Sequence, residues 1–374
     1  MRLYEEKAAC CGCGACADAC PVQAIRMVSD GEGFRYPELS GADCVRCGRC
    51  AAVCPLKAER TAHQENLFFG ARSNALRSGS SSGGVFAVLA EEILERGGAV
   101  FGAAYGTDMA VVHREARNRE ALQGLRRTKY VQSRLDGVYI RIRSLLKEGR
   151  WVLFCGTPCQ AHALKRFLGE PYPTLLLADL VCYGVPSPGI WRRYVALLER
   201  RHGGRLTEFS FRDKRARDNG HTRCYTTGSR EYTSSLGEDI FCKMFFANLS
   251  IRPSCHACRY CTPDRESDFT LGDFWGIERV RPEWDDGMGT SLVILHTEKA
   301  RQVWAQIRGG LDWFPCRQAD ALQPRLREPT PVSRFRGAFM AACRVLPAGW
   351  LFPLSTAALS AAGLCRRLVV RRRR

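Results

Sequence analysis

The sequence lacks an apolar run at its start. Its first residues are mostly polar and charged, and they lead directly to Cys10. A secretory signal peptide requires an apolar stretch of about 7–15 residues, so nothing indicates secretion, and we expect a cytoplasmic protein. Thiols in that compartment are kept reduced. The 20 cysteines of the chain are therefore expected to bind metal rather than to form disulfides.

Acidic residues are few compared with basic ones. The 38 Asp and Glu residues are outnumbered by 56 Lys and Arg residues, which gives a net charge of +18. Such a surface attracts acidic proteins, phosphorylated cofactors, nucleic acid or lipid headgroups. Aromatic residues are rare among the arginines, which favours a solvated basic face over a nucleic-acid site. The arginine clusters cover residues 114–127, 192–193, 212–217 and 366–374.

The composition fits neither disorder nor a polytopic membrane bundle. Hydrophobic residues make up 45% and charged residues 25% of the chain, and the mean hydropathy is -0.22. These values are typical of a globular protein with a core of its own. At roughly 150 residues per domain, the 374 residues predict two or three domains.

Two matching cysteine runs stand near the start of the chain. Each has the spacing C-x2-C-x2-C-x3-C-P, and the second lies 34 residues after the first. This spacing is typical of bacterial two-cluster ferredoxins, in which the fourth cysteine of one run binds the cluster of the other. Zinc, the alternative, explains neither the third cysteine nor the Cys-Pro ending. We therefore predict one [4Fe–4S] cluster on Cys10, Cys13, Cys16 and Cys54, and a second on Cys44, Cys47, Cys50 and Cys20. Cys11, which lies between these ligands, is assigned no role.

A serine- and glycine-rich segment, residues 77–84, precedes an apolar-periodic stretch that begins at Val85. The pattern predicts a loop that opens a helix, followed by a strand over Ala99–Tyr105. A helix N-terminus offers free backbone N–H groups and a positive dipole end, which suit the pyrophosphate of a dinucleotide. The alternative is a flexible N-cap without a ligand.

Further along, residues 151–180 have the pattern strand, helix, strand. Parallel pairing in such a unit puts Cys159 and Cys182 just beyond the carboxyl ends of neighbouring strands, where open α/β sheets bind their ligands. A third cysteine group, C-x2-C-x2-C over residues 255–261, has no Cys-Pro partner and must recruit ligands from elsewhere. Cys159 and Cys182 are the natural candidates. We favour a third [4Fe–4S] cluster, with zinc or a catalytic thiol as alternatives.

Five ordered motifs resemble the coenzyme F420 hydrogenase/dehydrogenase beta-subunit family. They are Ser81–Gly84, Lys129–Ser133, Gly156–Gln160, Cys182–Pro188 and Cys255–Gly276. The resemblance extends from Cys10 to about His296 and implies an iron–sulfur flavoprotein with FAD and one cluster near the flavin. It implies FAD contacts from Ser81, Ser82, Gly83, Gly84, Lys129, Tyr130, Ser133, Gly156, Thr157, Pro158 and Gln160, and a proximal cluster on Cys159, Cys182, Cys255 and Cys258. Cys261 is then a spare or exchanged ligand.

The function implied is a flavin- and iron–sulfur-dependent oxidoreductase. Electrons from ferredoxin or another acidic electron-transfer protein would pass through the clusters to FAD and on to, or from, a soluble organic substrate. That substrate is coenzyme F420 or another small molecule. Lys129 is the candidate catalytic residue, because a positive group near the isoalloxazine stabilises the reduced flavin. A non-catalytic electron-transfer subunit that docks on a separate hydrogenase, dehydrogenase or reductase is the alternative. A nucleic-acid binder without a flavin is a second one.

We predict an α+β protein with a small ferredoxin-like two-cluster domain and a larger α/β flavin-binding domain whose mixed sheet contains the βαβ unit. Its segments are the ferredoxin-like domain 1–62, the loop-bearing region 67–150, the region 151–330 with FAD contacts and the proximal cluster, and the basic tail 331–374. An uncharged stretch of 21 residues ends at Cys365 and precedes a closing segment that contains six arginines. Prolines and glycines interrupt the uncharged stretch, so we expect a helix that packs on the body or lies on a membrane surface, rather than one that spans it.

Overall fold

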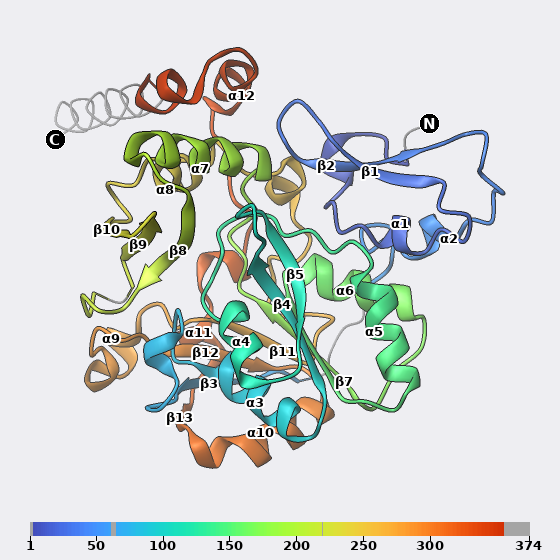
Figure 1. The fold of residues 1–374 in the computed structure, drawn as a ribbon. Helices are drawn as coiled ribbons and strands as arrows, with labels where there is room; N and C mark the ends of the chain where they lie inside the picture. Colours follow the sequence, from blue (N-terminus) through green and yellow to red (C-terminus); the bar gives the residue numbers. More distant parts are fainter. Residues whose placement is uncertain (1–2, 61–64, 219, 355–374) are drawn as a thin grey trace, which may run out of the picture.

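The computed structural model describes residues 3–60, 65–218 and 220–354. A small N-terminal lobe lies beside a larger body that is built around one central sheet (Figure 1). This arrangement confirms the predicted α+β class, with a small iron–sulfur domain followed by a mixed α/β domain. The predicted helix at the end of the tail falls on residues 355–374, which lie outside the described residues.

The N-terminal lobe contains two short helices, α1 (Ala15–Asp18) and α2 (Arg49–Ala52), and an antiparallel hairpin of β1 (Ile25–Ser29) and β2 (Arg35–Leu39). Gly14 and Gly48, at equivalent positions of the two cysteine runs, precede the helices with φ of 81° and 73°. Glycine adopts this left-handed conformation at little cost. The backbone of both runs therefore turns in the same way before its helix.

The central sheet has eight strands in the order β13-β3-β12-β11-β7-β6-β4-β5. The adjacent strands β4, β6, β7 and β11 run parallel, and the other neighbours pair antiparallel. Strands from both sides of residue 150 share this sheet. The bounds are β3 Leu67–Arg72, β4 Ala99–Tyr105, β5 Val111–Ala116, β6 Val152–Gly156, β7 Leu175–Leu180, β11 Phe269–Asp273, β12 Ser291–Leu295 and β13 Asp312–Pro315.

The predicted βαβ unit is present as β6, the helix α6 (Pro158–Leu168) and β7, with β6 and β7 in parallel register. Thr157 and Gln160 form a capping box, in which the Thr157 N–H donates to Gln160 Oε1 at 2.9 Å, and Pro158 occupies the first helical position. These local signals fix where α6 begins. Cys159 in the first turn of α6 and Cys182 just after β7 consequently lie at the same edge of the sheet.

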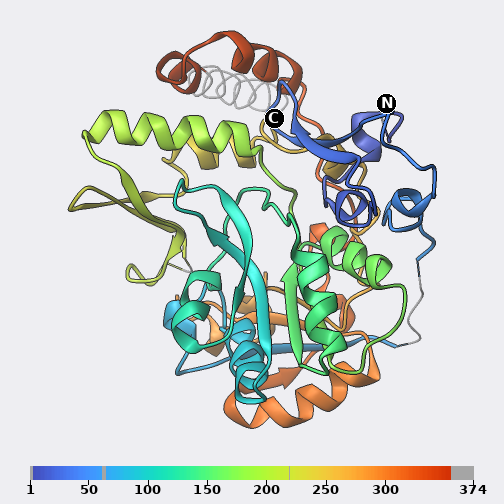
Figure 2. The same ribbon diagram turned by 45° about the vertical axis from the view of Figure 1, so that its right-hand side comes forward.

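Helices cover both faces of the sheet (Figures 1 and 2). Side chains of alternate strand residues point to opposite faces, so Leu153 packs in one apolar core and Phe154 in the other. Each core is completed by a helix residue that is fully buried, such as Leu89 on the first face and Leu164 on the second. The helices are α3 Val85–Glu95, α4 Arg119–Leu125, α5 Val138–Lys147 and α10 Glu298–Ile307, with the short α9 Ile277–Val280 and α11 Gln318–Ala321 near the sheet end.

A second sheet, in the order β10-β9-β8, is separate from the first. Its core is aromatic: Trp191 packs edge-on against Phe209 and Phe241, with ring centroids 5.0 and 5.2 Å apart. The surrounding elements are α7 Pro188–His202, β8 Leu206–Asp213, β9 Thr222–Thr227, β10 Arg230–Ser235, α8 Ile240–Phe246 and α12 Arg336–Val345. Figure 2 shows α12 beside α7, at the side of the molecule that carries the N-terminal lobe. No helix among the described residues is long and apolar enough to cross a membrane.

Candidate functional site

Four of the five sequence motifs meet at the carboxyl edge of the parallel strands, and hydrogen bonds join them. The Thr128 N–H donates to Ser81 Oγ at 2.7 Å, which ties the glycine/serine loop to the segment that carries Lys129. The Gln160 side chain donates to Ser133 Oγ at 3.1 Å. The backbone N–H of Gln132, next in the chain, donates to the Pro186 carbonyl at 3.1 Å. The segment 128–133 is therefore the link between the motifs.

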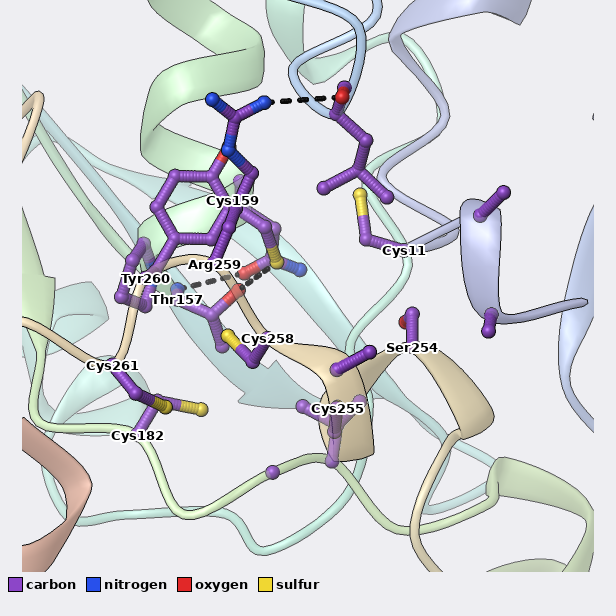
Figure 3. A pocket seen from close by; sticks show the side chains of 18 of the residues that line it. Cys11, Thr157, Cys159, Cys182, Ser254, Cys255, Cys258, Arg259, Tyr260 and Cys261 are labelled. Atoms are coloured by element: carbon purple, nitrogen blue, oxygen red, sulfur yellow. Dashed lines mark hydrogen bonds between the residues drawn. The ribbon is translucent and has the colours of Figure 1, made fainter. Parts of the chain in front are cut away.

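A cavity of about 630 Å³ lies where the N-terminal lobe meets the body (Figure 3). Cysteines from four separate stretches of the chain line it, together with Gln132 and Tyr183. Three residues predicted to contact FAD, Thr157, Pro158 and Gln160, belong to the same wall. The cavity cysteines are Cys11, Cys159, Cys182, Cys255, Cys258 and Cys261.

The cavity thiols are buried and close enough to influence one another. Burial raises the pKa of Cys182 well above its usual range, and the neighbouring Cys255, Cys159 and Cys258 raise it further. Burial likewise raises the pKa of Cys255 to about 12, with contributions from Cys258 and Cys159. Several thiolates in one buried site require a cation to balance them, and sulfur is the ligand that soft metal centres prefer. The donor set therefore fits an iron–sulfur centre.

Cys258 and Cys261 form a pair within this group. The Cys261 thiol donates to Cys258, which lowers the Cys258 pKa to about 6, and the Arg265 and Arg60 charges act in the same direction against burial. Cys258 is thus the thiolate of the pair. Among the described residues, no three His, Cys, Asp or Glu side chains converge closely enough to hold a single metal ion.

Cys11, to which the sequence assigned no role, lies in the cavity wall. Its thiol hydrogen-bonds to Cys159 and to Cys13 (Figure 3 shows Cys11 and Cys159). Its carbonyl accepts a hydrogen bond of 2.8 Å from the Gln132 side chain. No sequence signal marks this position, because the other cavity cysteines are more than 140 residues away along the chain.

The cysteines of the two runs come together within the N-terminal lobe. Burial raises the pKa of Cys16 to about 12, and Cys10 and Cys54 raise it further, so Cys54 of the second run lies near two thiols of the first. Other thiols of the lobe pack against a separate small apolar cluster of Ala24, Ile25 and Leu39. Those next to this cluster are Cys20, Cys44 and Cys50, and also Cys16.

The glycine/serine loop has structural requirements of its own. Gly83 is packed so tightly that a Cβ atom would lie 2.2 Å from the Ala71 carbonyl oxygen. Gly84 caps α3 with a φ of 91°, and Ser82 Oγ donates to the Thr290 carbonyl at 2.9 Å. The loop is thereby pinned between β3 and β12, with the N-terminus of α3 at its end. It lies outside the thiol cavity.

Lys129 lies at the end of α4, where its Nζ donates to the carbonyls of Gly124 at 2.8 Å and Arg126 at 2.7 Å. Burial lowers its pKa to about 7, the Arg127 charge lowers it further, and Cys155 opposes both. The next residue, Tyr130, packs against Phe211 and Phe245 with centroids 5.1 and 5.3 Å away. Lys129 and Tyr130 therefore lie between the loop and the cavity.

The basic cluster 212–217 is not wholly the solvated face that the sequence predicted. Lys214 is only 5% exposed, because β8 ends beside the glycine/serine loop. Its Nζ donates to the carbonyl of Arg77 at 2.9 Å and to that of Ser82. Burial lowers the Lys214 pKa to about 7, and Arg212 adds to this effect. A buried amine at the loop is a functional candidate that only the fold reveals.

The comparisons with known proteins agree with the two-part organisation. Residues 149–311 match the C-terminal part of the family described as coenzyme F420 hydrogenase/dehydrogenase, beta subunit. Residues 9–58 match the 4Fe-4S dicluster domain. No curated protein matches the chain.

Among solved structures, a xenon-derivatised F420-reducing [NiFe] hydrogenase complex from Methanosarcina barkeri is similar. The similarity has a TM-score of 0.44 and 17% sequence identity, and it covers 68% of this chain and 83% of that chain. The chain is an iron–sulfur protein with a redox role that belongs to the coenzyme F420 hydrogenase/dehydrogenase beta-subunit family and carries a 4Fe-4S dicluster domain at its N-terminus.

Proposed function

We propose that this chain is an iron–sulfur flavoprotein oxidoreductase. It would take electrons from a ferredoxin-type donor through [4Fe–4S] clusters to FAD and exchange them with a soluble organic substrate, coenzyme F420 or another small molecule. The observation that carries this proposal is the thiol cavity: six cysteines line a space directly against the ferredoxin-like lobe. This chemistry needs a redox centre there, because thiols alone do not relay single electrons.

The proposed ligands of a third [4Fe–4S] cluster are Cys159, Cys182, Cys255 and Cys258. All four line the cavity, and their mutual effects on pKa support their closeness. Thiols spread around a space of about 630 Å³ suit a cluster, whose ligands sit at the corners of a cube, better than a single zinc ion with its short bonds. Cys261 then acts as the hydrogen-bond donor to Cys258 rather than as a ligand.

FAD is proposed to occupy the sheet edge beyond the cavity, where a flavin supplies the conversion between one-electron and two-electron transfer. The glycine/serine loop would bind its phosphates through the N-terminus of α3 and the amine of Lys214. Lys129 and Tyr130 would lie beside the ring system. Thr128 at the loop and Gln132 at the cavity are four residues apart, so at most about 14 Å of chain separates the two sites.

The family match also supports a second candidate function. The matched family is described as a beta subunit, and a subunit that feeds electrons to a separate redox enzyme would need the same clusters without a substrate of its own. The two functions differ in turnover. A stand-alone enzyme oxidises an artificial one-electron donor with a small acceptor, and an electron-transfer subunit does so only after its partner subunit is added.

Anaerobic purification of the full chain, followed by iron, sulfide and flavin assays, tests the proposal. Three clusters give about 12 irons and two give about 8. We expect about 12 irons with one FAD per chain. A sample with about 8 irons, no flavin and bound zinc would contradict both the third cluster and the flavin.

A further inference from the structure

Arg252 connects the body of the protein to the first cysteine run. It directly precedes the turn that carries Cys255, and its side chain is fully buried, at 0% exposure. Its Nε donates to the Cys10 carbonyl at 2.9 Å, and its Nη2 donates to the Arg35 carbonyl at 3.1 Å. Its Nη1 donates to Gln132 Oε1 at 3.0 Å. The guanidinium therefore holds the Cys10 loop against the segment that reaches the cavity.

No acidic side chain balances this charge. Among the residues that the structure describes, Arg252 forms no ion pair with a carboxylate, and its ring contact is with Tyr36, 4.2 Å from the guanidinium carbon. Asp30 and Glu32, which lie in the same hairpin turn, pair instead with Lys7 and Arg336. A buried charge without a partner is strongly unfavourable.

A second fully buried arginine illustrates the usual solution. Arg265, at 1% exposure, faces the carboxylate of Asp179 with 3.9 Å between charged atoms. For Arg252, the anionic candidate within reach is the Cys10 thiolate, because Nη2 lies 3.7 Å from Cys10 Sγ. A [4Fe–4S] cluster bound by four thiolates has a net negative charge, which would serve as the missing counter-ion.

The glycine at position 12 supports this interpretation independently. Gly12 has a φ of 68°, and its counterpart 34 residues later, Arg46, has the same left-handed conformation with a φ of 53°. The turn itself therefore accepts a side chain in the second run. In the first run a Cβ at Gly12 would lie 2.6 Å from Arg252 Nη1. The glycine thus leaves room for the guanidinium.

We propose that Arg252 is a positioning residue that neutralises the cluster held by Cys10, Cys13, Cys16 and Cys54 and raises its reduction potential. A positive charge and N–H···S hydrogen bonds stabilise an added electron on such a cluster. The electron is then retained on the ferredoxin-like cluster whose loop contacts the thiol cavity. The inference rests on the two-cluster lobe of the proposed function, but it needs neither the flavin nor the third cluster.

The test is an EPR-monitored redox titration of the full chain, purified anaerobically, for wild type and Arg252→Gln. We expect one cluster to become at least tenfold harder to reduce, a shift of about 59 mV or more for one electron, while the other clusters keep their potentials. Arg252→Lys, which keeps the charge, should shift the same cluster less. Arg223→Gln is the control, because this arginine is also buried but pairs with Asp239, 2.6 Å away in the second sheet.

A fully loaded Arg252→Gln protein with unchanged potentials would overturn the proposal, and so would an equal shift in the Arg223→Gln control. Selective loss of about four irons would support it, since the cluster would then lack its counter-charge. If Arg252→Gln does not fold, Gly12→Ala decides, because the added Cβ displaces the guanidinium without removing its charge. A lowered potential of the same cluster supports the proposal, and an unchanged one contradicts it. Failure of the proposed function would appear instead as missing flavin or third-cluster iron.

Discussion

At the scale of single residues, the chain offers more cavity cysteines than one cluster needs. Cys182 is buried among other thiols, whereas Cys261 interacts mainly through its hydrogen bond to Cys258. We expect Cys182→Ser to reduce the iron content from about 12 to about 8 per chain, and Cys261→Ser to leave it at about 12. A serine hydroxyl still donates to Cys258. Iron and sulfide assays on anaerobic protein read this directly, and the opposite pattern would make Cys261 the ligand.

Lys214 gives the proposed flavin site a pH dependence. Its pKa is lowered to about 7, so the amine is charged below that pH and neutral above it. The charged form attracts phosphate, and losing one charge-assisted hydrogen bond costs about 1.5 kcal/mol, or roughly tenfold in affinity. We expect FAD affinity, measured by fluorescence quenching, to fall about tenfold between pH 6 and pH 8.

Lys214→Arg is the matched variant for this experiment, because a guanidinium stays charged throughout that range. The variant should bind FAD with little change between the two pH values. An identical decline in wild type and variant would mean that another group titrates, and Lys214 would then be only a clamp for the loop.

Residue-scale predictions from sequence were reliable where ligands are local. The spacing within each cysteine run predicts a 4Fe-4S dicluster domain, and residues 9–58 match one. Arg252 and Cys11 could not be found in this way. Arg252 reaches Cys10 across 242 positions, and neither residue belongs to a recurring spacing. Only the packing of the lobe on the body gives them neighbours.

At the scale of elements, the N-terminus of α3 depends on Gly83. Gly83→Ala would bring a Cβ to 2.2 Å from the Ala71 carbonyl, and such overpacking costs about 1–3 kcal/mol. We expect the variant to lower the free energy of unfolding by this amount in flavin-free protein, as measured by urea denaturation.

Gly124→Ala is the control for that measurement. Gly124 lies in α4 with open space around its Cα, so alanine should leave stability unchanged or raise it by up to about 1 kcal/mol. Equal stabilities of the two variants would show that α3 can shift to accept a side chain at position 83. The role of Gly83 would then be sought in the cofactor alone.

Sequence patterns predicted the elements whose boundaries are marked locally. The helix that begins at Val85 and the strand Ala99–Tyr105 both occur, because glycines interrupt the apolar pattern between them. The antiparallel side of the sheet was not foreseen. There β3 pairs with β12 and β13, more than 200 residues later, and no local signal specifies such partners. The aromatic second sheet escaped prediction for the same reason.

At the scale of the whole molecule, the charge of +18 should govern the encounter with an acidic donor. Electrostatic steering accelerates association and weakens as salt screens it. We expect the rate of reduction by reduced ferredoxin, followed by stopped-flow absorbance, to fall about tenfold between roughly 0.05 and 0.5 M salt. Reduction by dithionite, a small donor, serves as the reference. A rate that does not depend on salt would indicate that the basic face plays no part in docking.

The cavity wall also has a consequence for biogenesis. Cys11 leaves the ribosome long before the stretch from Cys255 to Cys261, yet both border the same space. The two ferredoxin-like centres can receive iron while synthesis continues, but the inner one cannot be built until translation has passed residue 261. Arg252 emerges just before that point and docks against a loop that is already loaded. Maturation of this protein is therefore expected to proceed in two stages, the second of which waits for most of the chain to be made.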